Sequence, residues 1–297
     1  MKISALSFIN SAVKNGAEVM LVNGRISDSS FKYYHYLGPI LKDMLANIDF
    51  FSMQSEQDLE YILKLGADPD KCANLGNTKF DQVYAQPDQT RKEKIYQEFK
   101  INKKAPVLVA GSTHPGEEEQ LLSVYQKLQS QFADLVMILA PRHIKRSAQI
   151  RNIFKKAGIR TVLRTEISRR KPAADKVILL DTIGELAGIY SVADLVFVGG
   201  SLIEKGGHNI LEPAVQGKLV FFGPHMFNFK ANTRLVLNYG VGVQVANQEE
   251  LTERMLYYLK NRAELEKKGR QAVQMVEENK GAALRNAEII EKLLLTG

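Results

Sequence analysis

Short apolar runs alternate with helical patterns along most of the chain after residue 104. Each run is continuous, and a loop and a helical pattern follow it. Continuous runs of this length are typical of strands that are buried on both faces of a parallel sheet. The runs occupy residues 106–111, 135–140, 176–181, 194–198, 218–223 and 241–245. Their alternation with helices predicts an α/β fold with a doubly wound parallel sheet and right-handed crossovers.

The same pattern is present in a weaker form before residue 82. Residues 18–23 and 49–54 predict buried strands, and residues 31–46 predict a helix. Ser55, with Asp58 three residues later, predicts the capped start of another helix. We therefore expect a second, incomplete parallel sheet in this part of the chain.

A polar segment at residues 82–104 separates the two patterns. It contains many charges, which predict a link between domains and one solvated helix. We expect a partial N-terminal domain with its linker at residues 1–97 and a second domain at residues 98–297. Both are predicted to be Rossmann-like, and the last helices are expected to pack back on the N-terminal domain.

A glycine-rich turn joins the strand at residues 194–198 to a predicted helix at residues 208–216. One glycine pair, at residues 199–200, ends the strand, and another, at residues 206–207, precedes the helix. Glycine-lined turns at the carboxyl edge of a parallel sheet are where α/β folds bind nucleotides. The unpaired N–H groups and the dipole at a helix start favour an anion there. This turn is therefore the first candidate for a nucleotide site.

Four loops that follow strands of the larger sheet carry side chains suited to a nucleotide. The carboxyl ends of parallel strands meet at one edge of a sheet, so we expect these loops to converge. They offer a guanidinium for a phosphate, hydroxyl and amide donors, and carboxylates that can accept from both hydroxyls of a ribose. In chain order, the candidates are Ser112, Thr113 and His114; Pro141, Arg142 and His143; Gly184, Glu185 and Leu186; and Ser201, Gly207, His208, Asn209 and Glu212.

The same residues also have purely structural interpretations. Glu212 lies three residues after Asn209 and suits a capping box at the helix start, with Pro213 in the first turn. Arg142 suits a surface salt bridge, and each histidine of these loops suits a packing role. No two histidines have the spacing of a zinc site and no carboxylates cluster near them, so we expect no metal and no cofactor.

Charge and composition limit the kinds of partner and the cellular location that we expect for this protein. The 297 residues carry a formal net charge of +7, which allows nucleic acid, an anionic membrane surface or an anionic substrate as partner. No segment resembles a nucleic-acid module, so we expect no nucleic-acid partner. The apolar runs are too short to span a bilayer, and the first residues do not have the pattern of a signal peptide. The single cysteine, Cys72, excludes an internal disulfide and fits a reducing cytoplasm.

Short motifs over nearly the whole chain resemble those of a known family. They lie at residues 22–27, 54–56, 76–80, 111–117, 141–143, 181–186, 197–202, 206–209, 211–213, 223–225 and 228–229. One motif alone is weak, but Pro-Arg-His, Gly-Gly-His-Asn and Leu-Glu-Pro in this order are specific. The chain thereby resembles the 3-deoxy-D-manno-octulosonic acid (Kdo) transferases of Gram-negative lipopolysaccharide synthesis, which have the GT-B glycosyltransferase fold.

The resemblance implies an activity and a set of residue roles. The activity is transfer of Kdo from CMP-Kdo to a lipid A precursor, lipid IVA. By position, Arg142 and Asn209 hold the phosphate of CMP, Glu212 holds the ribose, and the turn at residues 184–186 contacts the cytosine. The resemblance further implies a peripheral location on the cytoplasmic face of the inner membrane, where a positively charged protein meets an anionic surface.

The chain departs from the family pattern at its N-terminus. Family members begin with a membrane anchor and a longer first half of the N-terminal domain, which carries a Gly-Glu pair whose carboxylate resembles the general base. Met1 corresponds to a point downstream of both, so we expect an N-terminally truncated chain without a nominated base. Three functions stay open: a Kdo transferase, active or inactive in this truncated form; a non-catalytic CMP-binding remnant or donor-binding half that needs a separate N-terminal piece; and, as a weaker alternative, a GT-B enzyme that uses a UDP-sugar.

Overall fold

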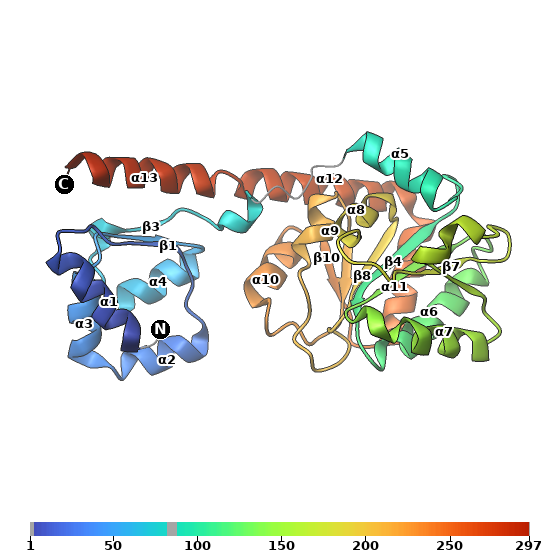
Figure 1. Cartoon of the computed structure of the whole chain (residues 1–297), viewed down its shortest axis with the longest axis horizontal. Coiled ribbons are helices and arrows are strands. Elements are labelled where there is room, and N and C mark those ends of the chain that lie inside the picture. Colours follow the sequence, from blue (N-terminus) through green and yellow to red (C-terminus); the bar gives the residue numbers. More distant parts are fainter. Residues whose placement is uncertain (1–2, 82–87, 297) are drawn as a thin grey trace. The chain divides into compact units, whose positions relative to one another are not determined.

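The computed structural model describes residues 3–81 and 88–296 and divides the chain into two compact units. The first unit comprises Met1–Val83 and Glu277–Gly297, and the second comprises Tyr84–Val276 (Figure 1). The end of the chain thus belongs to the first unit. The division falls before helix α5 (Gln89–Glu98), whereas the sequence pattern placed the domain boundary after residue 97.

The first unit contains a three-stranded parallel sheet and its own apolar core. The strand order is β1-β2-β3, and Phe51 in the central strand pairs with Leu21 on one side and Cys72 on the other. Phe51 and Met53 are completely buried in this core. The elements are α1 (Ile3–Lys14), β1 (Met20–Gly24), α2 (Asp28–His35), α3 (Gly38–Ala46), β2 (Phe50–Met53), α4 (Glu56–Lys64), η1 (Pro69–Lys71), β3 (Cys72–Asn74), η2 (Thr78–Phe80) and α13 (Ala282–Thr296).

Two helices of the first unit test the sequence pattern directly. The side chain of Ser55 accepts a hydrogen bond from the N–H of Asp58 at 3.2 Å, so the predicted cap of α4 is confirmed. The prediction of a single helix at residues 31–46 was wrong, because the structure has the two helices α2 and α3 there. The break is at Gly38, which has a left-handed backbone (φ +47°) and precedes a proline at the start of α3.

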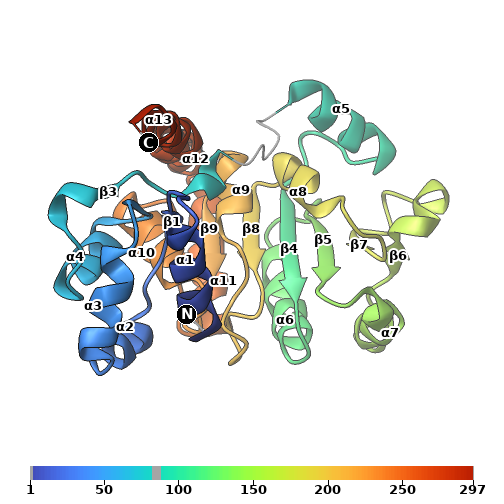
Figure 2. The same cartoon turned by 60° about the vertical axis from the view of Figure 1, so that its left-hand side comes forward.

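A seven-stranded sheet forms the centre of the second unit. Its strand order is β10-β9-β8-β4-β5-β7-β6, and all neighbouring strands are parallel (Figure 2). In the middle strand, Val109 pairs with Val196 on one side and with Ile138 on the other. The predicted parallel α/β sheet is therefore confirmed.

The elements of the second unit alternate between strands and helices in chain order. The first of them are α5, β4 (Val107–Thr113), α6 (Glu117–Gln129), β5 (Val136–Pro141), η3 (Ile144–Arg146), α7 (Ser147–Lys156), β6 (Thr161–Leu163), η4 (Arg164–Arg169) and β7 (Val177–Leu179). They continue with α8 (Leu186–Ile189), η5 (Tyr190–Val192), β8 (Leu195–Val198), α9 (Leu211–Val215), β9 (Val220–Phe222), α10 (Lys230–Asn238), β10 (Gly242–Gln244), α11 (Gln248–Lys260) and α12 (Arg262–Asn279). The end of α12, from Glu277 on, belongs to the first unit.

Both faces of this sheet are buried. On one face, Leu108, Met137 and Phe197 belong to the core that also contains the apolar residues of α6, α7 and α11. Val109 and Val196 point to the other face and are also completely buried. Strands with two buried faces lack polar alternation, which is why they read as continuous apolar runs.

Two features of the second unit differ from the sequence pattern. Strand β6 was not predicted, because it is a three-residue edge strand that directly follows charged and glycine residues. The helix expected at residues 208–216 is shorter and begins at Leu211. Gly206 and Gly207 have left-handed backbones, and Asn209 accepts a hydrogen bond from the N–H of Leu211 at 3.1 Å, so the chain turns before the helix starts.

Candidate functional site

The four candidate loops follow strands at the carboxyl edge of the larger sheet. They lead from β4 to α6, from β5 to η3, from β7 to α8 and from β8 to α9. The four strands are neighbours in the order β8-β4-β5-β7 (Figure 2). Neighbouring parallel strands place the loops that follow them at one edge. The N–H of Arg142, for example, donates to the carbonyl oxygen of Thr113 at 2.9 Å, which joins the first two loops.

The carboxylate of Glu117 joins the first loop to the fourth. It is completely buried and accepts four backbone hydrogen bonds. Oε2 accepts from His114 at 3.0 Å and from Gly200 at 2.7 Å. Oε1 accepts from Ser201 at 3.0 Å and from Leu202 at 3.1 Å. Burial raises the pKa of this carboxyl group, and the four N–H donors oppose the rise. Glu117 thus fixes the glycine-rich turn to the start of α6.

Glycine is required where the first and fourth loops meet. A Cβ on Gly199 would lie 2.5 Å from the carbonyl oxygen of Ser112. Real Cβ atoms essentially never come so close to another atom that is not bonded to them. The next residue, Gly200, has a left-handed backbone with φ +67°. The glycine pair therefore permits the close approach of the two loops and the turn away from the strand.

Three histidines gather beside Arg142. The Nε2 atoms of His114 and His208 are 2.8 Å apart, and their rings are stacked with centroids separated by 5.1 Å. The ring of His143 meets that of His114 edge-on, at 6.1 Å between centroids. One Nε2 must donate and the other accept, so protonation of both rings would bring two N–H groups into opposition.

The imidazoles of His208 and His114 favour the neutral form. Burial, reinforced by the charges of His114, Arg142 and His143, lowers the pKa of His208 to about 4. Burial and neighbouring cations also lower the pKa of His114. At neutral pH these rings can therefore donate or accept hydrogen bonds without adding charge.

The side chain of Arg142 is exposed at the edge of the histidine cluster. Within residues 3–81 and 88–296 it forms no ion pair, so the structure lacks the surface salt bridge that the sequence left open. Lys205, from the fourth loop, adds a second exposed cation close enough to His114 to affect its titration. Cations beside hydrogen-bonding imidazoles suit an anion such as a phosphate.

Asn209 and Glu212 form a hydrogen-bonded pair at the start of α9. Asn209 accepts from the N–H of Leu211 through Oδ1 and donates through Nδ2 to Glu212 Oε1 at 3.2 Å. Burial raises the pKa of Glu212, and the hydrogen bond from Asn209 opposes that effect. Asn209 thus satisfies the N–H of Leu211, the first residue of the helix, while the N-cap position itself is Ile210, without a side-chain cap. The other carboxylate oxygen of Glu212, Oε2, has no hydrogen-bond partner in the part of the chain that the structure describes.

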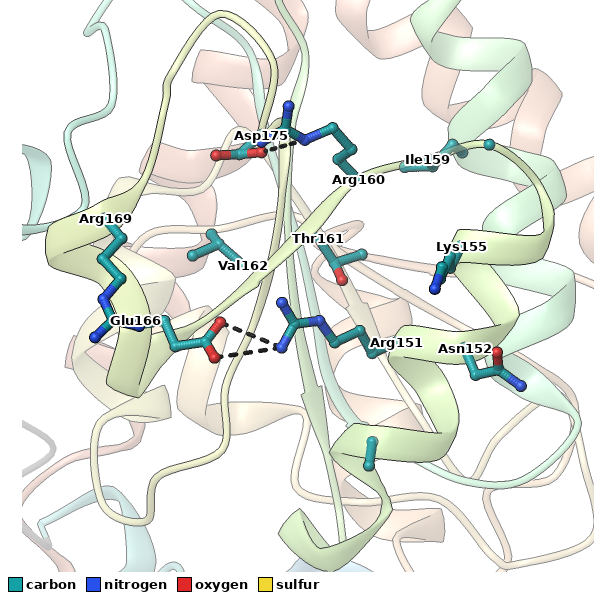
Figure 3. Close-up of a pocket in the computed structure, with 12 residues that line it drawn as sticks. Arg151, Asn152, Lys155, Ile159, Arg160, Thr161, Val162, Glu166, Arg169 and Asp175 are labelled. Atoms are coloured by element: carbon teal, nitrogen blue, oxygen red, sulfur yellow. Dashed lines mark hydrogen bonds and ion pairs between the residues drawn. The ribbon is translucent and has the colours of Figure 1, made fainter.

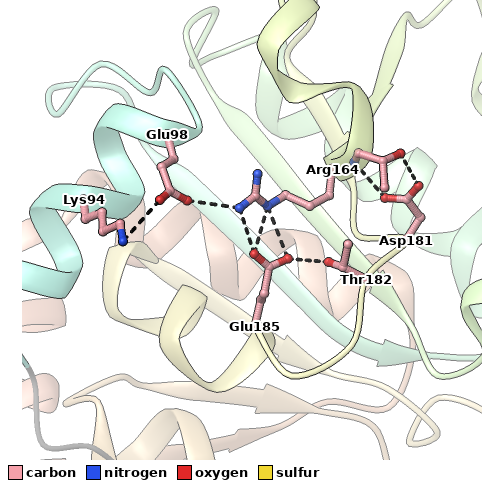
Figure 4. A network of polar contacts seen from close by, with 7 residues as sticks. Lys94, Glu98, Arg164, Asp181, Thr182 and Glu185 are labelled. Atoms are coloured by element: carbon pink, nitrogen blue, oxygen red, sulfur yellow. Dashed lines mark hydrogen bonds and ion pairs between the residues drawn. The ribbon is translucent and has the colours of Figure 1, made fainter.

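The carboxylate of Glu185 is bound by other side chains of the second unit (Figure 4). Arg164 donates to it through Nε at 3.0 Å and through Nη2 at 2.8 Å, and Thr182 donates through its hydroxyl. Arg164 also pairs with Glu98 of α5 at 3.0 Å. Burial acts to raise the pKa of Glu185, but the hydrogen bonds from Arg164 and Thr182 outweigh it and lower the pKa. The carboxylate is thus part of a structural network behind the third loop.

The hydroxyl groups of Thr113 and Ser201 also bind protein atoms. Thr113 donates to Glu118 Oε1 at 3.0 Å. Ser201 donates to the carbonyl oxygen of Val198 at 2.6 Å and accepts from the N–H of Gly223 at 2.9 Å. Both side chains are buried, so they support the loops from inside.

The remaining candidates contribute mainly backbone. Ser112 is partly exposed and has a left-handed backbone with φ +57°. Pro141 is buried at the end of β5, and Gly207 is buried against Met226. Gly184 has φ +89° and open space where a Cβ would point, and Leu186 begins α8.

Sequence reasoning missed the charged residues that hold the loops together. Glu117 and Glu118 are both buried, and Glu118 pairs with Arg146, which donates at 2.7 and 3.2 Å. Arg164 plays the corresponding part for the third loop. Three consecutive glutamates directly after a glycine turn are a signal at the sequence level, but most partners of the two buried ones are far away in the chain and no local pattern reveals them.

Among residues 3–81 and 88–296, no group of three or more His, Cys, Asp or Glu side chains is arranged to hold a metal ion. In the same residues, none of the helices has the length and apolar character needed to cross a membrane.

Comparison with known proteins gives a consistent result at the sequence level. Residues 6–82 match the family model described as 3-Deoxy-D-manno-octulosonic-acid transferase (kdotransferase). A bifunctional glycosyltransferase/methyltransferase of Fusobacterium nucleatum is 37% identical over 83% of the chain and 38% of that protein. A 3-deoxy-D-manno-octulosonic acid transferase of Rickettsia felis is 32% identical over 93% of the chain and 59% of that protein. The chain therefore spans less than two thirds of the length of these relatives.

Solved structures resemble the fold. The C-terminal CMP-Kdo binding domain of WaaA from Acinetobacter baumannii is 28% identical, with a TM-score of 0.58 over 63% of this chain and 96% of that domain. UDP-GlcNAc 2-epimerase from Neisseria meningitidis, bound to UDP-GlcNAc, has a TM-score of 0.62 at 13% identity over 98% of this chain and 73% of that one. Together with the two parallel sheets, these likenesses confirm the predicted GT-B type of fold.

Proposed function

The chain belongs to the family of 3-deoxy-D-manno-octulosonic acid (Kdo) transferases, and we propose that its second unit binds CMP-Kdo as the donor for Kdo transfer. The observation that carries the proposal is the group of loops at the carboxyl edge of the larger sheet, where Arg142 lies beside neutral imidazoles. The likeness of this unit to a CMP-Kdo binding domain at 28% identity supports the choice of nucleotide.

The proposed chemistry places the phosphate of CMP at Arg142. Transfer breaks the bond between the anomeric carbon of Kdo and a phosphate oxygen, so negative charge develops on the departing CMP. A guanidinium stabilises that charge more in the transition state than in the bound donor, which lowers the barrier. The acceptor hydroxyl bonds to the anomeric carbon and releases its proton. No residue of the described chain is assigned as the base for that proton.

The ribose and the base have their own contacts in the proposal. Glu212 has one carboxylate oxygen without a partner, and a carboxylate can accept from both ribose hydroxyls. The left-handed turn at Gly184 leaves open space beside the third loop, which suits the cytosine. Helix α9 has only five residues, so its dipole contributes less to the site than the longer predicted helix would.

The proposed acceptor is a phosphorylated lipid A precursor, lipid IVA, on the cytoplasmic face of the inner membrane. A net charge of +7 suits an anionic lipid, an anionic donor and an anionic surface alike. The chain spans 59% of the Rickettsia felis transferase and 64% of that of Haemophilus influenzae. Donor binding is therefore the part of the activity that the described site addresses most directly.

Calorimetric titration of the full chain with CMP and with cytidine tests the proposal. We expect Arg142→Ala to weaken the binding of CMP by about 1.5 to 3 kcal/mol, which is the range for a hydrogen bond to a charged group. Cytidine has no phosphate, so its affinity should change little. Arg254→Ala, an exposed arginine of α11, is the matched control and should leave both ligands unaffected.

Three outcomes discriminate between the functions when the titration is extended to UDP and combined with a Kdo transfer assay. Equal losses for CMP and cytidine would remove Arg142 from the phosphate site. Tighter binding of UDP than of CMP would favour the UDP-sugar alternative. CMP binding without transfer of Kdo to a synthetic lipid A precursor would support a donor-binding protein in place of a complete transferase. We expect the CMP affinity to persist in EDTA, because cationic side chains supply the compensating charge.

A further inference from the structure

A groove of about 790 Å³ runs along the outer edge of the larger sheet. Its walls come from α7, the edge strand β6 and the 3-10 helix η4 (Figure 3). Among the described residues, strand β6 pairs with β7 alone, so its other edge faces the groove. The groove shares no lining residue with the four candidate loops.

Four cationic side chains line this groove. Arg151 and Lys155 are one helical turn apart on α7, so they occupy the same face of that helix. Arg160 precedes β6, and Arg169 ends η4. Figure 3 shows Arg151, Lys155 and Arg160 around the strand segment that carries Thr161, and Arg169 on η4 at the opposite side of the groove. Like charges one turn apart repel each other, so Arg151 and Lys155 together favour an anion nearby.

The two carboxylates of the groove do not balance these cations. Glu166 pairs with Arg151 at 3.2 Å, and Asp175 pairs with Arg160 at 3.1 Å. Lys155 and Arg169 are exposed and have no carboxylate partner within residues 3–81 and 88–296. Two positive charges therefore remain uncompensated inside one concave surface.

The wall that carries Arg169 is fixed in place by buried contacts. The neighbouring residue, Arg170, is only 4% exposed, and its guanidinium donates to the carbonyl oxygens of Phe99 at 2.5 Å and Asp175 at 3.0 Å. Asp175 in turn accepts from the N–H of Lys171 at 2.8 Å. The segment between η4 and β7 is thus tied to the body of the unit. A fixed wall means that the groove exists before a ligand arrives.

We propose that this groove is a second anion site, which binds the phosphate monoester group of a small ligand or of a lipid headgroup. A phosphate monoester carries close to two negative charges at neutral pH, which matches the two uncompensated cations. Guanidinium groups bind phosphate oxygens in pairs, and Asn152 and Thr161 add polar groups to the lining. The volume lies within the range of small-ligand sites, and Ile159 and Val162 offer apolar surface to the carbon part of the ligand.

The test uses the full chain with Arg142→Ala, so that the candidate CMP site does not contribute. Glycerol 3-phosphate serves as the soluble probe, and phosphatidylcholine vesicles with phosphatidic acid serve as the lipid probe. The groove variant is Lys155→Ala with Arg169→Ala. The matched control is Lys127→Ala with Arg254→Ala, which removes the same charge from exposed positions on α6 and α11.

We expect the groove variant to weaken binding by about tenfold or more, because two charge-assisted contacts are lost, and the control to leave it unchanged. Binding should also weaken below about pH 6, where the phosphate loses its second charge. A tenfold loss with glycerol 3-phosphate identifies a soluble ligand, and a loss with vesicles alone identifies a headgroup. Equal binding of both probes by the groove variant and the control, or no binding by either, overturns the proposal. The outcome does not depend on CMP binding.

Discussion

At the residue scale, the candidate site depends on side chains whose partners are other protein groups. Glu117 is the clearest example, because one buried carboxylate satisfies four N–H groups from two loops. Those N–H groups belong to turns that make no regular secondary structure, so they need an acceptor from elsewhere. A charged acceptor serves this purpose well, since hydrogen bonds to a carboxylate are stronger than those to neutral groups.

Replacing Glu117 with Gln should lower the free energy of unfolding by roughly 2 to 4 kcal/mol. The amide has one acceptor oxygen, and its NH₂ group would face N–H donors that the second carboxylate oxygen now satisfies. Urea unfolding monitored by circular dichroism measures the change. Glu119→Gln, at an exposed position of the same helix, is the control and should cost little. Equal stability of the two variants would show that the loops do not depend on this carboxylate.

The histidine pair predicts how stability depends on pH. Burial and nearby cations lower the pKa of His208 from 6.5 to about 4 in the folded protein. Between these values the unfolded chain binds more protons than the folded one, so the free energy of unfolding falls as the pH falls. Above the unfolded value the ring is neutral in both states, and below the folded value no further loss occurs.

We expect this effect to cost the native protein roughly 1 to 2 kcal/mol between about pH 7 and about pH 4.5, less than the full shift implies because the partly exposed ring is screened by water. His208→Gln cannot titrate, so its stability should decline less over the same interval. Urea midpoints of both proteins at the two pH values measure the difference. Parallel declines would mean that other groups cause the acid sensitivity.

At the element scale, the strands of the larger sheet could be predicted because burial on both faces leaves an unmistakable apolar run. Residues 135–140, for example, became β5 (Val136–Pro141) almost unchanged. Strand β6 was missed, since an edge strand of only three residues does not require a long apolar run in the sequence. The helix predicted at residues 31–46 was too long, because the apolar spacing continues across Gly38. Only the backbone angle of Gly38 marks the break.

The position of the candidate site could also be predicted, but its internal connections could not. Strand-to-helix loops of a parallel sheet meet at one edge by geometry, so Arg142, His143 and His208 were expected near one another. The role of Glu185 was not visible, because its partner Arg164 lies 21 residues away in a 3-10 helix after the missed strand. Long-range ion pairs follow from the fold and leave no periodic trace in the chain.

The network of Arg164 predicts a coupling between elements. This arginine connects η4 with the third loop through Glu185 and with α5 through Glu98, and it lies over the ring of Phe99. A double-mutant cycle with Arg164→Ala and Glu185→Ala should give a coupling free energy of about 1 kcal/mol, since the pair is only partly buried. Additive effects of the two substitutions on unfolding would mean that the contact does not stabilise the loop.

At the scale of the whole molecule, each of the two units contains an apolar core of its own. One cluster is built from residues between Leu41 and Ala67, inside the first unit. The other is built from residues between Leu108 and Leu265, inside the second unit. Each core has its own parallel sheet. A unit that has its own core and its own sheet can in principle fold by itself.

We therefore expect calorimetry of the full chain to show two unfolding transitions, of which CMP raises only one. All four candidate loops belong to the second unit, so bound CMP stabilises the core of that unit alone. At a ligand concentration about 100 times the dissociation constant, the gain is about 2.7 kcal/mol. Arg142→Ala should abolish most of the shift without moving the other transition, which serves as an internal control. A single transition would show that the two cores unfold together, and a CMP effect on both transitions would contradict a donor site confined to the second unit.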